Sequence, residues 1–299
     1  MFWLDSLLAS YETPTVVSDA RPCDEIVLRT KAKHAVTMWR LHSNHLEENG
    51  EIVEKVAPGL KEIERFDVAL TLTHQQKKDI ETFIAPAKAN IEVIPHASLA
   101  FLQNEAVYER KIQHTKAIVI SRFSEIKRID HILEAFRLVL QEVPHAILEL
   151  YGIGSEEDHL RTLVTKHHLE HNVLFRGYTY EPASRYTEAL FSILASKSEG
   201  FSLSILESMS MGTPVISYDI HYGPTDLITS GENGWIVPNG DYKALATKMV
   251  WMFQHKEQAI AMGKRAALHM KEVFHKEAYS KRWLDVVSCA IAKKKQKNL

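Results

Sequence analysis

From about residue 113 onward, short apolar runs alternate with amphipathic segments, and this alternation constrains the fold more than any other feature. Buried-strand patterns occupy 117–120, 146–151, 173–176, 191–195, 214–217 and 234–237. Helical patterns occupy 129–142, 155–168, 182–189, 203–211 and 241–254. Strands that alternate with helices in this way form a parallel sheet with helices on both faces. The sequence therefore predicts an α/β fold with a doubly wound sheet in this half of the chain.

The first 112 residues carry a shorter series of the same kind. Strand patterns occur at 15–18, 34–39, 67–73 and 91–94, and helical patterns occur near 24–29, 46–56 and 74–83. Two more helices are expected at 256–274 and 277–295. We therefore predict a partial Rossmann-like domain over 1–112, a complete one over 113–276, and a final helix with a basic tail over 277–299. The hinge is expected between Ala97 and Gln113.

Composition excludes several classes of function. The chain has 299 residues and a net charge of -2, so no basic field draws it to nucleic acid. Cys23 and Cys289 are far apart, which argues against a disulfide framework and fits the cytoplasm. No apolar run reaches the ~18 residues of a membrane span. The start of the chain, 1–8, lacks the basic region of a signal peptide.

Two carboxylates, Glu199 and Glu207, stand eight residues apart across a predicted strand–loop–helix junction. Glu199 follows strand 191–195, and Glu207 lies about two turns into the next helix. The helix start at Ser202–Ser204 offers free backbone N–H groups and a positive dipole end, which suit a phosphate. This layout fits a nucleotide sugar, with hydroxyl groups on both sides of a diphosphate. Two solvated surface charges are the alternative interpretation.

Arg122 and Lys127 flank the turn between strand 117–120 and helix 129–142. Open α/β sheets bind ligands at such turns. An arginine can form two bonds to a phosphate, and a lysine adds a point charge. The pair therefore predicts a diphosphate site, with two ordinary surface cations as the alternative.

These two motifs, in this order, resemble the C-terminal half of GT-B retaining glycosyltransferases of family 4. Arg122 and Lys127 are similar to that family's diphosphate clamp, and Glu199 with Glu207 to its E-x7-E motif. The segments 41–45 and 217–226 are similar to a subgroup that transfers glucose or N-acetylglucosamine to bacterial poly(polyol phosphate) wall polymers and serine-rich proteins. The resemblance covers roughly residues 15 to 285.

The resemblance implies transfer of a hexose from a UDP-sugar, with retention, to teichoic acid of the cell wall or to a protein. Glu207 would bind the ribose, whereas Glu199 and His45 would act as catalytic residues at the hexose. A hydrogen-bonded structural histidine is the alternative for His45. The other donor-binding residues that the resemblance implies are Gly200, Phe201, Ser202, Leu203, Gly152 and Tyr178. Tyr178 would stack on the base, and a plain βα turn is the alternative for Gly152.

No metal or cofactor is expected, and the UDP-sugar would be a substrate only. No Asp-x-Asp pair stands where a metal–diphosphate site would be. His42 and His45 lack a third ligand at a recognisable spacing. Gly152 and Gly154 lack the third glycine of a dinucleotide fingerprint, which disfavours an oxidoreductase.

The family's first strand, its glycine-rich loop and the subgroup's inserted β-rich region are not found in the sequence, so the N-terminal domain is expected to be incomplete. Unpaired strand edges attract partners. We therefore expect either a homo- or hetero-oligomer formed through the first half, or low acceptor activity alone. Two alternatives remain: a non-catalytic chain that binds the donor or a partner, and a UDP-sugar epimerase.

The resemblance also implies that the final helix returns to the first domain. Its basic end, 293–297, is expected either to be solvated or to contact anionic lipid at the inner membrane face.

Overall fold

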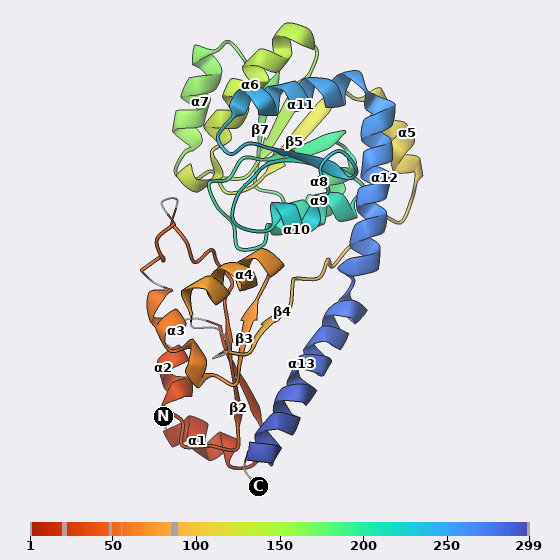
Figure 1. Cartoon of the computed structure of the whole chain (residues 1–299). Coiled ribbons are helices and arrows are strands. Elements are labelled where there is room, and N and C mark those ends of the chain that lie inside the picture. Colours follow the sequence, from red (N-terminus) through yellow and green to blue (C-terminus); the bar gives the residue numbers. More distant parts are fainter. Residues whose placement is uncertain (1, 20–22, 48–49, 55, 85–88, 298–299) are drawn as a thin grey trace. The chain divides into compact units, whose positions relative to one another are not determined.

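The computed structural model describes residues 2–19, 23–47, 50–54, 56–84 and 89–297, and the chain forms two compact units (Figure 1). Unit 1 comprises Met1–Ala97 and Lys276–Leu299, and unit 2 comprises Ser98–His275. The sequence placed the boundary after residue 112. Residues 98–112 belong instead to unit 2, because helix α5 (Ala106–Gln113) packs on α12 (Lys256–Val273).

Unit 1 is built on a parallel sheet with the order β1-β2-β3-β4. The strands are β1 (Thr15–Ser18), β2 (Val36–Arg40), β3 (Val68–Thr71) and β4 (Ile91–Val93). Helix α13 (Lys276–Lys297) covers one face, where Trp283 packs near Val36 and Met38. The alternate residue Trp39 points to the other face. That face is covered by α2 (Cys23–Leu28), α3 (Ala57–Lys61), the 3-10 turn η1 (Ile63–Arg65) and α4 (His74–Phe83).

Two parts of unit 1 differ from the sequence prediction. The helix predicted at 46–56 is wrong for the described residues, since Leu46 and Ile52 form an antiparallel bridge around a turn at Gly50. Residues 48, 49 and 55 of that range lie outside the described residues. The next helix begins at Ala57, where Pro58 has the fixed φ of a helix start. A short helix that was not predicted, α1 (Phe2–Leu8), buries Leu8.

Unit 2 is built on a parallel sheet with the order β10-β9-β8-β5-β6-β7. The strands are β5 (Lys116–Ile120), β6 (Ile147–Tyr151), β7 (Val173–Gly177), β8 (Phe191–Leu194), β9 (Val215–Tyr218) and β10 (Gly234–Val237). All six predicted strands are confirmed. Because the chain moves outward from β5 in one direction and then returns to β8 beside it, the sheet has a topological switch point between these two strands.

Helices lie on both faces of this sheet (Figure 1). They are α5, the 3-10 turn η2 (Glu125–Lys127), α6 (Ile129–Glu142), α7 (Glu157–Lys166), α8 (Pro182–Thr187), α9 (Leu203–Ser210), α10 (Pro224–Leu227), α11 (Tyr242–Gln254) and α12. On the α8 side of the sheet, Ile118 packs with Tyr186 and Met211. The helix predicted at 129–142 is confirmed as α6, and it buries Ile132, Leu133, Phe136 and Val139.

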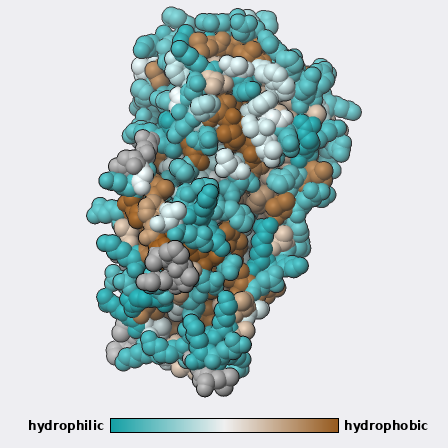
Figure 2. Space-filling model, in the orientation of Figure 1, coloured by the Kyte–Doolittle hydropathy of each residue, from teal (hydrophilic) through white to brown (hydrophobic). Residues whose placement is uncertain are grey.

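Polar and charged residues cover much of the face drawn in Figure 2, with smaller apolar areas between them. Among the described residues, no helix combines the length and apolarity that a membrane-crossing helix requires.

Candidate functional site

Two loops of unit 2 that carry the predicted site residues Arg122, Lys127 and Glu199 meet at the switch point. Strands β5 and β8 pair in parallel, with Ala117 opposite Phe191. Their carboxyl ends therefore open into two loops, 121–128 and 195–202, at the same edge of the sheet. This is the place where open α/β sheets bind their ligands.

Salt bridges and a backbone bond hold the two loops together. The Lys127 Nζ lies 2.6 Å from the Glu199 Oε1, and these side chains are 18% and 15% exposed. The Lys197 Nζ lies 2.6 Å from the Glu125 Oε1, and this hydrogen bond lowers the pKa of the Glu125 carboxyl. The backbone N–H of Lys197 also donates to the carbonyl of Ile126, at 2.7 Å. These contacts join the loop after β5 to the loop after β8 at the carboxyl edge of the sheet.

Glu199 is fixed from both sides. The hydroxyl of Ser196 donates to its Oε1 at 2.7 Å. Its backbone N–H donates to the carbonyl of His221 at 2.9 Å, and its carbonyl accepts from the N–H of Tyr222 at 2.7 Å. From the sequence, Lys127 is predicted to bind the diphosphate and Glu199 to act at the hexose. The structure places these two side chains in direct contact, so a phosphate that binds Lys127 must compete with Glu199.

The start of α9 follows Glu199 directly. Ser202 occupies the N-cap position with φ 72°, and its carbonyl accepts from the N–H groups of Ile205 and Leu206. Its buried hydroxyl has no hydrogen-bond partner among the described residues. The first N–H groups of the helix have no intrahelical acceptor. Residues 202–204 therefore offer backbone donors at the predicted helix start, and binding of a phosphate there stays a prediction.

Gly200 and Phe201 complete the loop before this helix. Phe201 is buried, and a Cβ on Gly223 would lie 2.1 Å from its carbonyl oxygen. Gly223 also has φ 105°, which a side chain rarely tolerates. Leu203, the first residue of α9, is half exposed. The loop after β9 thus supports the loop after β8 through close backbone contact.

Glu207 lies on the exposed side of α9, in the second turn. Its carboxylate forms no hydrogen bond or ion pair within the part of the chain that the structure describes. Partial desolvation raises its pKa. Burial strongly raises the pKa of Tyr186, and the nearby charge of Glu207 raises it further. Glu207 is therefore a carboxylate that can accept hydrogen bonds from a ligand.

The two predicted cations differ in their surroundings. Arg122 is exposed and its guanidinium forms no ion pair with any described residue, whereas Lys127 is held by Glu199. A third cation, Arg128, was missed. It begins α6 with φ 44° and donates to the carbonyl of Ser196 at 3.0 Å and to Asn239 at 2.6 Å. Its position directly after Lys127 was the only signal in the sequence.

Gly152 follows β6 and is explained by backbone packing. Its φ is 151°, and a Cβ there would lie 1.8 Å from the carbonyl oxygen of Ser121. A Cβ on Gly154 would lie 2.1 Å from the carbonyl oxygen of Phe123. The loop after β6 therefore presses against the loop that carries Arg122, and contact of Gly152 with a nucleotide stays a prediction.

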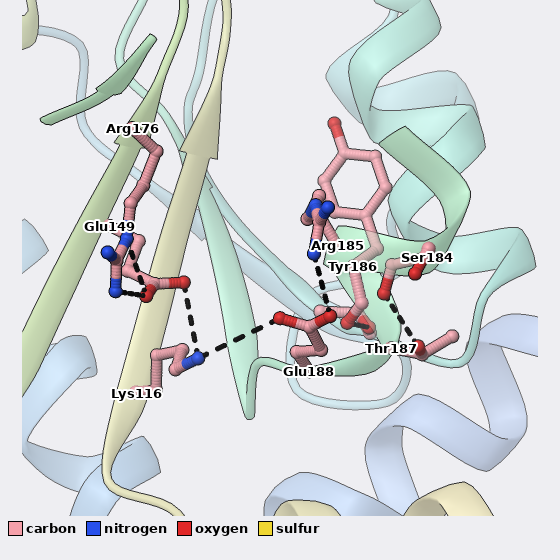
Figure 3. A network of polar contacts seen from close by, with 9 residues as sticks. Lys116, Glu149, Arg176, Ser184, Arg185, Tyr186, Thr187 and Glu188 are labelled. Carbon is pink, nitrogen blue, oxygen red and sulfur yellow. Dashed lines mark hydrogen bonds and ion pairs between the residues drawn. The ribbon is translucent and has the colours of Figure 1, made fainter. Parts of the chain in front are cut away.

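Tyr178 follows β7 at the rim of a polar pocket of about 400 Å³. Its ring is 61% exposed and packs edge-on against Tyr180, with 4.8 Å between the ring centroids. Inside the pocket, Arg176 donates to the buried carboxylate of Glu149 at 2.6 Å, and Lys116 lies 3.2 Å from the same carboxylate (Figure 3). An exposed ring is available for stacking, and that role also stays a prediction.

His45, the predicted catalytic histidine, belongs to unit 1 and is fully buried. Its ring lies edge-on to Phe83, with 6.0 Å between centroids.

The surface histidine at the carboxyl ends of β1, β2 and β4 is His42, which bonds Asp19 at 3.0 Å and stacks on His96. Burial, followed by the charges of nearby groups, lowers the pKa of His96 to about 4. From the sequence, His42 was weighed individually only as a possible metal ligand together with His45.

The sequence is similar to those of two glycosyltransferases that act on polyol-phosphate polymers. The chain is 27% identical to a Bacillus subtilis poly(glycerol-phosphate) alpha-glucosyltransferase over 94% of this chain and 42% of the relative. It is 25% identical to a Staphylococcus aureus poly(ribitol-phosphate) alpha-N-acetylglucosaminyltransferase over 96% of this chain and 57% of the relative. The chain thus spans about half the length of these relatives.

A solved structure shows the fold. The pneumococcal O-GlcNAc transferase GtfA in complex with UDP and GlcNAc matches with a TM-score of 0.80 at 21% identity, over 97% of this chain and 60% of that chain. The predicted GT-B fold class is therefore confirmed. The family described as "Glycosyl transferases group 1" matches residues 103–269, which include every site residue of unit 2. As this match spans more than half of the chain, the protein belongs to the glycosyl transferases group 1 family.

Proposed function

We propose that the protein transfers glucose or N-acetylglucosamine from a UDP-sugar to a polyol-phosphate polymer or a protein, with retention at the anomeric carbon. The observation that carries the proposal is the Lys127–Glu199 pair at the switch point, directly before the open start of α9. A cation, helix N–H donors and carboxylates meet there, as a nucleotide sugar requires. The names of the two curated relatives support the hexose and the acceptor.

The diphosphate would lie at the start of α9, where Arg122 and Lys127 stabilise the charge that develops on the leaving UDP. Lys127 would exchange part of its contact with Glu199 for a phosphate oxygen. Glu199 would then accept hydrogen bonds from hexose hydroxyls while Ser196 keeps it in place. Glu207, without an ion partner within the described residues, would accept bonds from the ribose hydroxyls.

This arrangement assigns different roles to Glu207 and Glu199, and substitution of each carboxylate tests it. Glu207→Gln should weaken UDP binding by about 10- to 100-fold, because a charged hydrogen bond contributes about 1.5–3 kcal/mol. Glu199→Gln should leave UDP affinity near that of the wild type and lower the rate of hexose transfer. Calorimetry with UDP and a transfer assay with UDP-glucose or UDP-N-acetylglucosamine measure both effects. Equal loss of UDP affinity in the two variants would refute the division of roles.

The products of the same assay separate the alternatives. A glycosylated polymer supports transfer, an epimerised UDP-sugar would support the epimerase, and tight UDP binding without any product would support a donor-binding chain. Absence of UDP binding by the wild type would overturn the donor site itself.

We further propose that no divalent ion neutralises the diphosphate, since Arg122, Lys127 and the α9 dipole supply positive charge there. EDTA should then leave the transfer rate unchanged. A rate that EDTA abolishes and Mg²⁺ or Mn²⁺ restores would contradict this part of the proposal.

The proposed location is the cytoplasm, with contact at the inner membrane face through the lysines that end α13. Lys294 is held by Asp67 at 2.8 Å and Lys295 by Glu12 at 2.7 Å, whereas Lys293 and Lys297 are exposed. Exposed lysines near a membrane contribute about 1 kcal/mol each in attraction to anionic lipid. Co-sedimentation with phosphatidylglycerol vesicles, but not with phosphatidylcholine vesicles, is the expected result. Equal sedimentation with both would argue against it.

A further inference from the structure

Lys111 is a buried cation that the sequence did not single out. It lies on α5 with 1% of its surface exposed. Its Nζ lies 3.0 Å from the carbonyl oxygen of Gly212 and 3.4 Å from that of Met211, and it also bonds the hydroxyl of Thr213. No carboxylate of the described residues pairs with it. The three groups that accept hydrogen bonds from its Nζ all lie just beyond the C-terminal end of α9.

The carbonyl groups at this end of α9 are satisfied in a definite way. The N–H of Gly212 donates to Met209, and the N–H of Thr213 donates to Ser208, which closes the helix around a left-handed Gly212 with φ 66°. The carbonyl of Ser210 accepts from the N–H of Leu102, at 2.9 Å. The carbonyls of Met211 and Gly212 take their donor from Lys111.

The turn at Gly212 is also enclosed sterically. A Cβ on Gly212 would lie 2.3 Å from the hydroxyl of Tyr108 on α5. A Cβ on Gly263 of α12 would lie 2.4 Å from the carbonyl oxygen of Gly212. Protein interiors packed this closely leave the turn no room to shift.

A buried ammonium without a carboxylate partner is costly, and burial lowers the pKa of Lys111 to about 7. The negative end of a helix dipole is one environment that offsets such a cost. A residue that only filled the space between α5 and α9 would be apolar. A lysine at this position therefore indicates that its ammonium group serves to bind the carbonyl groups at the end of α9.

We propose that Lys111 is a positioning residue that fixes α9 along its length and thereby sets the anion-binding start of the helix and Glu207. Helix α9 has eight residues, about 12 Å, so a shift at one end moves the other. A second connection runs from Thr213, whose hydroxyl donates to the carbonyl of Tyr186 at 2.6 Å, to the neighbourhood of Glu207. The inference rests on the proposed donor site.

The test compares UDP affinity with thermal stability in the full chain. Lys111→Met should raise the Kd for UDP by about 10-fold, the effect of one strong hydrogen bond, at a temperature where the variant is folded. The KM for the UDP-sugar should rise while the KM for the acceptor stays unchanged. Thr213→Val, which removes one contact of Lys111 and keeps the side-chain volume, should raise the Kd by about 3-fold.

Two control variants separate positioning from stability. Lys264 also lies over the ring of Tyr108, at 5.1 Å, but it is half exposed and pairs with Glu105, so Lys264→Met should bind UDP like the wild type. Leu160→Ala removes a buried side chain of α7 and should lower Tm without changing the Kd.

The inference is overturned if Lys111→Met loses Tm as Leu160→Ala does and still binds UDP with the affinity of the wild type. Unchanged affinity in Thr213→Val would overturn it as well if Lys111→Met does not fold. A wild type that fails to bind UDP would overturn the proposed function first, and this inference with it.

Discussion

The carboxyl edges of the two sheets carry different chemistry. In unit 2 the edge is charged, with Lys127 against Glu199 and Arg122 exposed beside them. In unit 1 the corresponding edge carries His42 and His96, and burial holds the pKa of His96 near 4. A charged edge matches a diphosphate, whereas an imidazole edge can exchange hydrogen bonds with neutral hydroxyl groups.

The strand orders of the two units also differ. In unit 2 the chain returns to place β8 beside β5, so two loops that leave neighbouring strands converge on one point. The described strands of unit 1 follow one another in sequence order, β1 to β4, and no such reversal occurs among them. The fold thus concentrates charge at the edge where the order reverses.

The largest expected effect comes from breaking the backbone contact under the charged edge. Gly152→Ala places a methyl group 1.8 Å from the carbonyl oxygen of Ser121 and should destabilise the protein by about 4 kcal/mol or more. The control is Gly177→Ala, since a Cβ there meets nothing within 4 Å and only the positive φ of 69° adds strain of about 1–2 kcal/mol. Urea denaturation measures both, and equal losses would show that the packing argument is wrong.

The next effect removes one charge from the edge. Lys127→Met should weaken UDP binding by about 10- to 100-fold, through loss of a charged hydrogen bond. Lys197→Met is the matched control, because Lys197 also pairs with a glutamate at 2.6 Å in the same loops. As the Glu125 side chain is 80% exposed, loss of this pair should change UDP affinity by no more than about 3-fold. Calorimetry that gives the same Kd for both variants would remove Lys127 from the phosphate site.

A smaller effect is expected at the imidazole edge. His42→Phe removes both ring nitrogens, and with them the bond to Asp19, and should lower kcat/KM for the acceptor by about 3- to 10-fold, the range for loss of one neutral hydrogen bond to an acceptor hydroxyl. The Kd for UDP should not change, because the residues proposed to bind UDP all belong to unit 2. A transfer assay with varied acceptor measures the first value and calorimetry the second. If UDP affinity falls as well, the two edges do not have separate tasks.

The smallest effect concerns pH. The folded protein holds the pKa of His96 at about 4, below the ordinary 6.5, so the unfolded chain takes up a proton first as pH falls. The contribution of His96 to stability is therefore complete above pH 6.5 and is lost as pH falls toward 4. His96→Gln should flatten the fall in denaturation midpoint between pH 7 and pH 5. The same slope in both proteins would show that His96 is not the responsible group.

Much of this architecture could be predicted from the sequence because local patterns determine it. The strands of unit 2 are short apolar runs between helical stripes, so the positions of Arg122, Lys127 and Glu199 in the loops after β5 and β8 could be predicted, and their roles stay predictions. The contact between Lys127 and Glu199 could not be predicted, since it depends on which strands become neighbours. Helix 46–56 was wrong because its apolar spacing suited a helix while Gly50 forms a turn.

Other features depend on tertiary packing that no local pattern signals. The sequence predicts a hinge over the segment that includes α5, whereas packing of α5 on α12 and the contacts of Tyr108 and Lys111 with the end of α9 hold this segment in unit 2. In the same way, the buried ring of His45 packs edge-on against Phe83, which lies far along the chain.

The return of the chain to β8 has a consequence for how the protein folds. Lys127 and Glu199 are 72 residues apart in the sequence, and strands β6 and β7 with their helices lie between them. Contacts of such long range form slowly, because a long loop must close before any contact compensates for its lost entropy. On a ribosome, the first loop of the site would emerge well before the second. UDP binding by a nascent or refolding chain would therefore report that strand β8 has entered the sheet.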